Sequence, residues 1–162
     1  TQYDDLVTLP CYEWQHVLVF PFGHPLLGKE RVGLEDLAQV PLITYHPSFT
    51  GRTRIDRAFA ARHLQPNVVL EAIDSDVIKT YVKLGMGVGI VAEMAMAGAE
   101  ATPDLVARPA GDLFGHNLAR VAFKRGIYLR NFVLRFAELL SDRLSRDLIM
   151  KAMQGQPDDY DL

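Results

Sequence analysis

The chain has 162 residues, of which 49% are hydrophobic and 23% are charged, a composition typical of one globular domain or two small lobes rather than of a disordered chain. Seventeen Lys and Arg against twenty Asp and Glu leave a formal charge of −3, so the segment lacks the general positive field that would wrap a polyanion such as DNA. A single cysteine, Cys11, excludes an internal disulfide and a Cys-rich zinc site. We expect it to be a small buried hydrophobe in a cytoplasmic protein. The apolar runs are too short to cross a bilayer, and we expect no signal peptide.

Strand-like and helix-like segments alternate along the chain. The expected strands lie at residues 6–10, 16–20, 41–45, 67–70, 88–92, 105–108 and 118–123. The expected helices lie at residues 34–38, 52–63, 74–84, 94–101 (a short helix and loop), 128–140 and 145–153. Strands separated by helices at this spacing predict an α/β fold, with a mostly parallel sheet flanked by helices in three layers.

Local signals fix some of these boundaries. A proline closes each of the first two strands, since it cannot donate to a sheet ladder. Asp74 or Ser75 is expected to cap the middle helix, and Gly85 to end it. Ser145 is expected to cap the last helix, and the acidic tail at 154–161 is expected to fray. The helix after Tyr128 has the clearest periodicity, and its predicted inward face is Leu129, Phe132, Val133, Phe136 and Leu140.

The glycines at 85, 87 and 89 invite comparison with a phosphate-binding loop. Such a loop leaves a strand and opens a helix, whereas here a helix ends and a strand begins. A helix end followed by tight entry into a buried strand explains these glycines better.

Residues 48–53 are the first candidate binding site. Ser48 and Thr50 lie between an expected strand and the helix that follows it. Gly51 has no side chain to shield the free backbone amides at the start of that helix. The Thr50 hydroxyl and the amides of residues 51–53 could therefore hold an anion or a carboxylate. The alternative is that Thr50 or Ser48 simply caps its own helix. Arg52 could add a positive charge or point to solvent.

Three other groups of residues have side chains suited to binding or catalysis. Tyr12 and Trp14 could line the wall of a cleft or anchor the core. The Asp74-Ser75-Asp76 segment is expected mainly to cap its helix, with a cleft-facing role as the minor alternative. The five histidines never approach metal-ligand spacing, and no nucleophile motif is present. The sequence therefore predicts no metal, no cofactor and no enzyme.

Several stretches resemble the effector-binding region of CysB-type LysR-family transcriptional regulators. They are residues 3–14 (Tyr-Asp-Asp-Leu-Val-Thr-Leu-Pro-Cys-Tyr-Glu-Trp), 24–26 (His-Pro-Leu), 37–45 (Leu-Ala-Gln-Val-Pro-Leu-Ile-Thr-Tyr), 49–52 (Phe-Thr-Gly-Arg) and 74–89. The Pro-Leu-Ile and Gly-x-Gly-x-Gly segments occur across the LysR family, whereas residues 3–14 and 49–52 are more particular to its sulfur-metabolism branch. The resemblance covers nearly the whole chain and weakens in the tail.

The resemblance implies two Rossmann-like lobes of the periplasmic-binding-protein type, with the effector in the cleft between them. It assigns residues 1–14 to the hinge strand and the end of the first lobe, and 15–115 to the second lobe. Residues 116–144 would be the returning strand and helix of the first lobe, and 145–162 the C-terminal helix and acidic tail. It also implies that the chain lacks the DNA-binding domain and the early first lobe.

The same resemblance implies a function in sulfur assimilation, either in cysteine biosynthesis or in organosulfur use. The effector would be a small anion such as sulfate, thiosulfate or an acetylserine, bound by Thr50 with Trp14 nearby. Ser48, Gly51 and Tyr12 complete the candidate set. We expect self-association, a tetramer in the full-length protein, and DNA contact only through the missing N-terminal domain. The alternative is a solute-binding lobe of a transporter-type protein.

Overall fold

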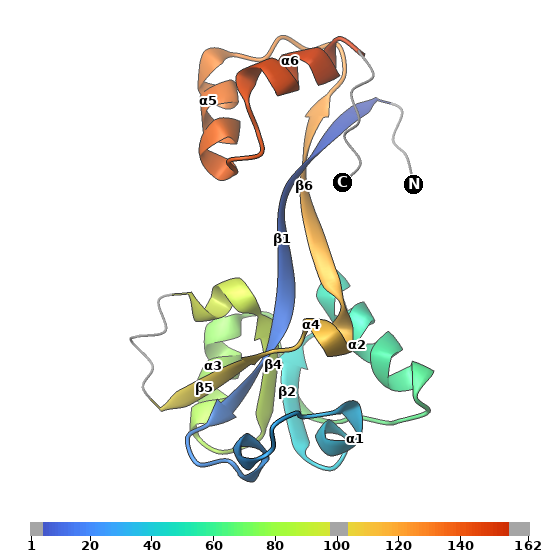
Figure 1. The fold of residues 1–162 in the computed structure, drawn as a ribbon, viewed down its shortest axis with the longest axis vertical. Helices are drawn as coiled ribbons and strands as arrows, with labels where there is room; N and C mark the ends of the chain where they lie inside the picture. The colour runs from blue at the N-terminus through green and yellow to red at the C-terminus, as the bar shows by residue number, and fades with distance from the viewer. Residues whose placement is uncertain (1–4, 98–103, 156–162) are drawn as a thin grey trace. The chain divides into compact units, whose positions relative to one another are not determined.

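A computed structural model describes residues 5–97 and 104–155 of the chain (Figure 1). The expected loop after residue 97 and the expected fraying of the tail beyond residue 155 lie outside the described residues. The chain divides into two compact units. One is Trp14–His116, and the other joins the described residues on either side of that span.

The strands form a mixed sheet with the order β3-β2-β4-β1-β5, and β6 pairs with β1 off this path. The strands are β1 (Leu6–Pro21), β2 (Pro41–Tyr45), β3 (Asn67–Ala72), β4 (Val88–Ala92), β5 (Leu105–Pro109) and β6 (His116–Lys124). β2 runs parallel to both β3 and β4, with Ile43 opposite Leu70 and Gly89. β1 runs antiparallel to β4 and β5, with Val17 opposite Val91 and Pro109.

The predicted α/β fold is confirmed, although the sheet is mixed rather than mostly parallel. Alternating strands and helices predict parallel neighbours only where a crossover helix joins two consecutive strands, as α2 (Thr50–Ala61) joins β2 to β3. β1 instead pairs with β4 and β5, which are distant from it in the sequence. Spacing along the chain does not determine the direction of such a pair.

The helices are η1 (Pro25–Gly28), α1 (Leu34–Leu37), α2 (Thr50–Ala61), α3 (Ser75–Lys83), η2 (Glu93–Met96), α4 (Gly111–Phe114), α5 (Asn131–Leu140) and α6 (Arg146–Met153). Most helices lie within a few residues of their predicted positions, but η1 and α4 were not predicted. Asp74 caps α3 by accepting from the Asp76 amide, and Gly85 follows the helix with φ +76°. Ser145 caps α6 as expected. None of the helices within residues 5–97 and 104–155 is long and apolar enough to span a membrane.

Alternate residues of the strands face two separate cores, as the twofold period of a strand requires. On one face, Leu18 and Ile90 pack with Ile55 and Phe59 of α2. On the other face, Val17, Val19, Ile43 and Val91 pack with Ile78 and Val82 of α3. The sheet therefore lies between α2 and α3.

The two N-terminal strands predicted at 6–10 and 16–20 are one continuous strand, β1. Pro10 and residues 12–14 lie inside it. A proline has a backbone φ that extended chain tolerates, and it lacks only the ladder donor. Cys11 is buried, as expected.

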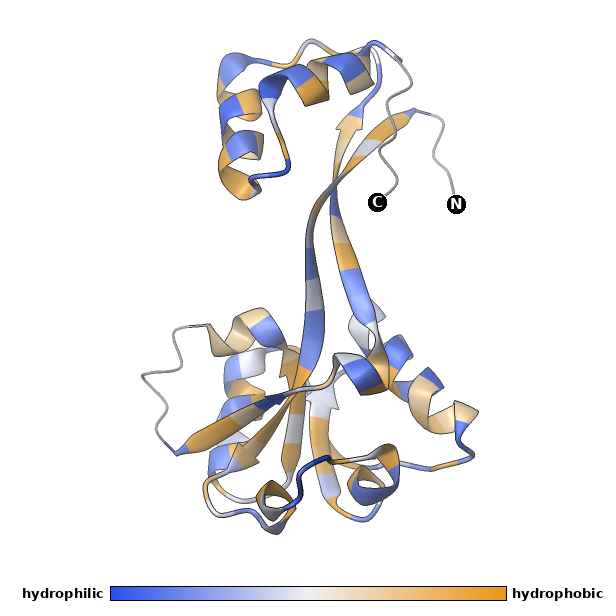
Figure 2. Ribbon diagram, viewed as in Figure 1, coloured by the Kyte–Doolittle hydropathy of each residue, from blue (hydrophilic) through white to orange (hydrophobic). Residues whose placement is uncertain are grey.

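The predicted inward face of α5 is wrong in part. Leu134 and Ala137 are the buried residues of the helix, while Phe132 and Phe136 are 68% and 65% exposed. Figure 2 shows hydrophobic residues at successive turns of α5. Because apolar residues occur on more than one side of this helix, periodicity alone could not identify the side that packs.

Candidate functional site

A hollow of about 580 Å³ opens in the Trp14–His116 unit, beside the starts of α2 and α3 and the ends of β2 and β4. The volume is within the range of small-molecule sites. In α/β sheets, ligands bind outside the carboxyl ends of parallel strands. The lining residues are Trp14, His16, Tyr45, Phe49, Thr50, Gly51, Ile73, Asp74, Ser75, Asp76, Ala92, Met94 and Ala95.

The start of α2 has no side-chain cap. Its N-cap residue is Phe49, which has no polar side-chain atom to accept a hydrogen bond from the first turn. The Arg52 amide bonds to the Phe49 carbonyl, 3.1 Å away. The first amides of a helix have no partner within the helix, so Thr50 and Gly51 present free donors at the hollow. The capping alternative for Thr50 and Ser48 is therefore wrong, and the Arg52 amide, which bonds to the Phe49 carbonyl, is not a free donor.

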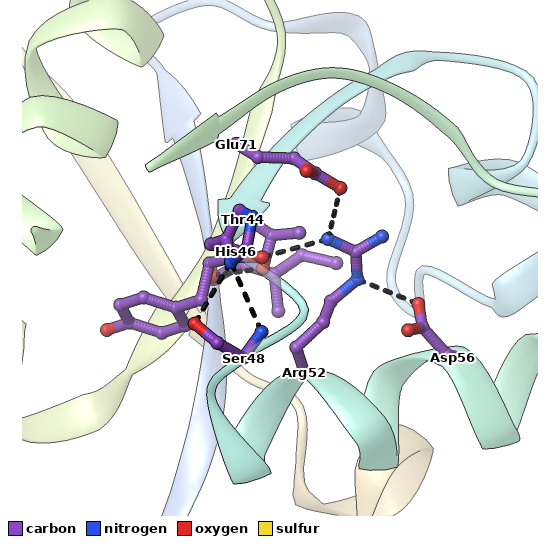
Figure 3. Close-up of polar contacts among 8 residues, drawn as sticks. Thr44, His46, Ser48, Arg52, Asp56 and Glu71 are labelled. Carbon is purple, nitrogen blue, oxygen red and sulfur yellow. Dashed lines mark hydrogen bonds and ion pairs between the residues drawn. The ribbon is translucent and has the colours of Figure 1, made fainter. Parts of the chain in front are cut away.

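Arg52 neither adds charge to the hollow nor points to solvent. Its side chain is buried (Figure 3), with Nε donating to Asp56 Oδ1 and Nη1 donating to Glu71 Oε1, both at 2.7 Å. Nη1 also donates to the Tyr45 carbonyl at 2.8 Å. Burial alone would lower the pKa of Arg52, but the hydrogen bonds to Asp56 and Glu71 outweigh it and raise that pKa. The guanidinium thus ties the first turn of α2 to the ends of β2 and β3.

Ser48 faces away from this arrangement. Its hydroxyl lies 2.9 Å from His46 Nδ1, and its own amide donates to the same nitrogen at 3.2 Å (Figure 3). Because the amide is a donor, Nδ1 is an acceptor, and the Ser48 hydroxyl donates to it. The Ser48 hydroxyl proton is therefore occupied within its own turn.

Tyr45 connects the Ala92 amide to the Ser75 hydroxyl through hydrogen bonds in the wall of the hollow. The Ala92 amide donates to Tyr45 Oη at 3.1 Å, and Tyr45 Oη lies 2.7 Å from Ser75 Oγ. Either oxygen can be the donor in this bond, which holds the Ser75 hydroxyl against Tyr45. Ser75 also lines the hollow, so its hydroxyl is placed to contact a group bound there.

The two helix starts at the hollow differ in charge. The first turn of α2 holds no acidic residue, whereas α3 has Asp74 as its cap and Asp76 in its first turn. A helix N-terminus attracts an anion, and a carboxylate placed there already satisfies that field. Neither Lys nor Arg lines the hollow. An anionic group is therefore better placed at α2 than at α3.

His16 of β1 lies at the wall between the two aromatic rings of Trp14 and Phe114. Its ring centroid is 5.1 Å from that of Trp14 and 5.9 Å from that of Phe114, both edge-on. A Cβ atom on Gly51 would lie 3.0 Å from His16 Nε2. Burial, followed by the charge of Arg54, lowers the pKa of His16 to about 4. The imidazole is therefore neutral at neutral pH.

Comparison with known proteins identifies the domain. The model of the LysR substrate binding domain matches residues 1–145. The chain belongs to the LysR substrate-binding domain family. The HTH-type transcriptional regulator CysB of Burkholderia cenocepacia is 52% identical to it over 162 residues, which are 100% of this chain and 51% of that protein. The HTH-type transcriptional regulator cbl of Escherichia coli is 43% identical over 157 residues, which are 96% of this chain and 49% of that protein.

A solved structure agrees with these relatives. The crystal structure of the cofactor-binding domain of the Cbl transcriptional regulator matches with a TM-score of 0.82 at 43% identity, covering 94% of this chain and 67% of that one. This LysR domain spans about half the length of the curated relatives it matches. Both relatives are named as HTH-type transcriptional regulators.

The predicted site residues of this LysR domain separate into two groups. Thr50, Gly51 and Trp14 line the same hollow. Ser48 is not part of its lining, and Tyr12 belongs to the other compact unit. No cluster of three or more His, Cys, Asp or Glu side chains in residues 5–97 and 104–155 could hold a metal ion.

Sequence reasoning missed His16 and Tyr45 in this LysR domain. In the sequence, His16 stands out only as one of five histidines without metal-ligand spacing. A lone polar residue before the apolar run 17–20 is nevertheless a usable signal of a buried polar side chain. Tyr45 ends an expected strand, and nothing in the local sequence marks it as a site residue. The role of Ser75 depends on Tyr45 and Ala92, which are distant from it in sequence, so no local pattern could indicate it.

Proposed function

We propose that this domain is the effector-sensing portion of a cytoplasmic LysR-type transcriptional regulator of sulfur assimilation, and that the hollow at the start of α2 binds its small anionic effector. The candidate effectors are sulfate, thiosulfate and the acetylserines. The observation that carries the proposal is the uncapped first turn of α2, where Thr50 and Gly51 open into the hollow. A hollow with free amides and a hydroxyl is suited to an oxyanion.

The donors around the hollow also favour one anionic group over two. Neutral amides and hydroxyls surround the α2 end, with no Lys or Arg in the lining. Asp74 and Asp76 at the α3 end repel a second negative charge. An effector with one anionic group at α2 and a neutral or cationic group near α3 fits this distribution best. The acetylserines have such a shape.

Effector binding would matter to transcription through the rest of the regulator. The formal charge of −3 disfavours DNA contact by this segment. We therefore propose that a helix-turn-helix domain outside these 162 residues contacts DNA, as the names of the HTH-type relatives suggest. An effector that binds one conformation of this domain more tightly increases the population of that conformation. This change then alters the arrangement of the oligomer on DNA.

Calorimetric titration tests the proposal. Sulfate, thiosulfate, O-acetylserine and N-acetylserine are titrated separately into the 162-residue protein, into Thr50→Ala and into Thr53→Ala. Thr53 is exposed on the same helix and does not line the hollow, so it is the matched control. We expect at least one ligand to bind the wild type and Thr53→Ala alike, and to bind Thr50→Ala about fivefold to tenfold more weakly. Equal affinity for all three proteins would contradict the site.

Self-association is the second part of the proposal. Tyr128 and four residues of α5 leave an apolar surface exposed beside the core of their unit. These residues are Tyr128, Phe132, Phe136, Leu139 and Leu140. Surfaces of this kind mark interfaces, and we expect a second copy to cover it, with a tetramer in the full regulator.

Sedimentation velocity tests the self-association. We expect oligomers of the 162-residue protein at tens of micromolar, and a shift toward monomer in the double variant Phe132→Ser, Phe136→Ser. Phe22→Ser is the control, since Phe22 is an exposed phenylalanine in the Trp14–His116 unit. A wild-type monomer, or an equal shift with the control, would contradict it.

A further inference from the structure

One polar side chain in the wall of the hollow has no polar partner. His16 is 0% exposed, and neither Nδ1 nor Nε2 makes a hydrogen bond. Buried polar atoms are nearly always paired, so an unpaired one requires an explanation. Its presence destabilises the protein unless another molecule supplies the partner.

Among the neighbours of the ring, Gly51 is the one that connects it to the free donors of α2. Trp14 and Phe114 occupy two sides with their rings. A Cβ atom placed on Gly51 would lie 3.0 Å from His16 Nε2, and Nε2 is the atom of the ring nearest to it. Gly51 carries one of the free amides at the start of α2 and also lines the hollow. His16 Nε2 and the α2 donors are therefore on the same side of the hollow.

We propose that His16 is an effector-binding residue, whose Nε2–H donates to an oxyanion oxygen of the effector beside the free amides of α2. The ligand class is a small molecule with a carboxylate or a sulfate-like group. This inference rests on the proposed function. It adds the imidazole N–H of His16 to the amide and hydroxyl donors at the start of α2.

The charge state of the ring suits this role. The low pKa of about 4, caused by burial and then by Arg54, keeps His16 neutral at physiological pH. A neutral imidazole has one N–H donor and one acceptor nitrogen. An anion accepting from Nε2–H stabilises added positive charge on the ring, so effector binding raises the pKa of His16.

Contact with the effector requires a movement of one neighbour. The His16 ring is closed to solvent in the free protein, but Trp14, which packs against it edge-on, is only partly buried. The Trp14 indole must therefore rotate away from the edge of His16 that faces Gly51 before an effector can reach Nε2.

Two substitutions at one position separate binding from packing. His16→Gln keeps an N–H donor near the position of Nε2, while His16→Phe keeps a ring between Trp14 and Phe114 but removes both nitrogens. We expect His16→Phe to bind O-acetylserine or sulfate about tenfold or more weakly than wild type, and His16→Gln to stay within about threefold. A purely structural role gives the opposite order, because Phe fits an aromatic site better than Gln does.

The stability of the same variants supplies a second readout. His16→Phe removes two unpaired buried nitrogens, so we expect its melting temperature to equal or exceed that of the wild type. A variant that is more stable and binds the effector less tightly supports a ligand role. A variant that loses stability and affinity in proportion overturns it.

Histidine ¹⁵N chemical shifts test the proposal on the unmodified protein, with the His16 signal assigned from its absence in His16→Gln. We expect O-acetylserine or sulfate to shift the Nε2 signal and to raise the pKa of His16. An unchanged signal at ligand saturation overturns the proposal. If Thr50→Ala weakens binding while His16→Phe does not, the hollow remains the effector site and only the role of His16 fails.

Discussion

His16 Nε2 and Gly51 approach so closely that a Cβ atom at position 51 would lie 3.0 Å from the nitrogen and 3.7 Å from Trp14 Cη2. Gly51 thus leaves space between the start of α2 and two aromatic rings of β1. This contact brings together three features of the hollow: a free amide, a neutral imidazole and a partly buried indole.

Gly51→Ala tests whether this space serves binding. The added methyl crowds the His16 edge, so we expect effector affinity to fall about tenfold. Stability should change by less than about 1 kcal/mol, because the better helix propensity of Ala offsets a contact that the neighbours can relieve by a small shift. Calorimetry and thermal unfolding measure the two effects. Gly28→Ala is the control, since no atom lies within 4 Å of a Cβ there. Unchanged affinity in Gly51→Ala would show that the space is not used.

A double-mutant cycle tests the hydrogen-bond chain from Tyr45 to Ser75. Ser75→Ala removes the hydroxyl that faces the hollow, and we expect about fivefold weaker binding. Tyr45→Phe leaves Ser75 in place but removes the group that orients it, so we expect about threefold weaker binding. The double variant should bind like Ser75→Ala, because orientation has no value once the hydroxyl is absent. Strictly additive losses would mean that the two residues act separately.

Arg52→Ala should destabilise the protein by about 2 kcal/mol, because it removes a buried guanidinium and leaves Glu71 and the Tyr45 carbonyl without their donor. Both carboxylate partners are partly exposed, which keeps the loss below that of a fully buried pair. Urea unfolding gives the measurement. Arg62→Ala is the control, since the pair of Arg62 with Glu35 is exposed on both sides, and we expect a change within about 0.5 kcal/mol. Equal losses would refute the role of Arg52 in joining α2 to the sheet.

The low pKa of His16 predicts a pH dependence of stability. Its pKa is about 4 in the folded protein against 6.5 for the free side chain, so between these values the unfolded chain binds more protons. The free energy of unfolding is therefore highest above pH 6.5 and should fall by about 2–3 kcal/mol toward pH 4.5.

His16→Phe is the comparison for this effect, and it should remove that part of the pH dependence. His24, whose pKa burial also lowers, contributes in the same direction in both proteins and cancels in the difference. Urea unfolding at pH 7.5 and pH 4.5 gives the four values. The same pH dependence in both proteins would mean that His16 does not carry the effect.

Local signals in the sequence predicted α3 best. Asp74, Asp76 and Gly85 mark its ends through their own chemistry, and the structure places its boundaries there. α2 was predicted to start two residues late, because its N-cap is Phe49, which carries none of the usual capping groups. The missing cap that hid the boundary also leaves the amides of Thr50 and Gly51 free.

Other features depend on contacts that no local pattern contains. Pro10 suggested the end of a strand, but β1 continues through it. Arg52 was expected to add charge to the site or to point to solvent, but its guanidinium is hydrogen-bonded to Glu71, a residue of another strand. The neutral state of His16 results from burial against Trp14 of β1, Gly51 of α2 and Phe114 of α4, which are three separate segments.

A structure of the domain with O-acetylserine or sulfate bound tests the proposed site most directly. The effector oxyanion should lie in the hollow at the start of α2, with one oxygen about 2.7–3.2 Å from Thr50 Oγ1 or the Gly51 amide. An effector bound elsewhere, with the first turn of α2 and the side chain of Thr50 left in water, would contradict it.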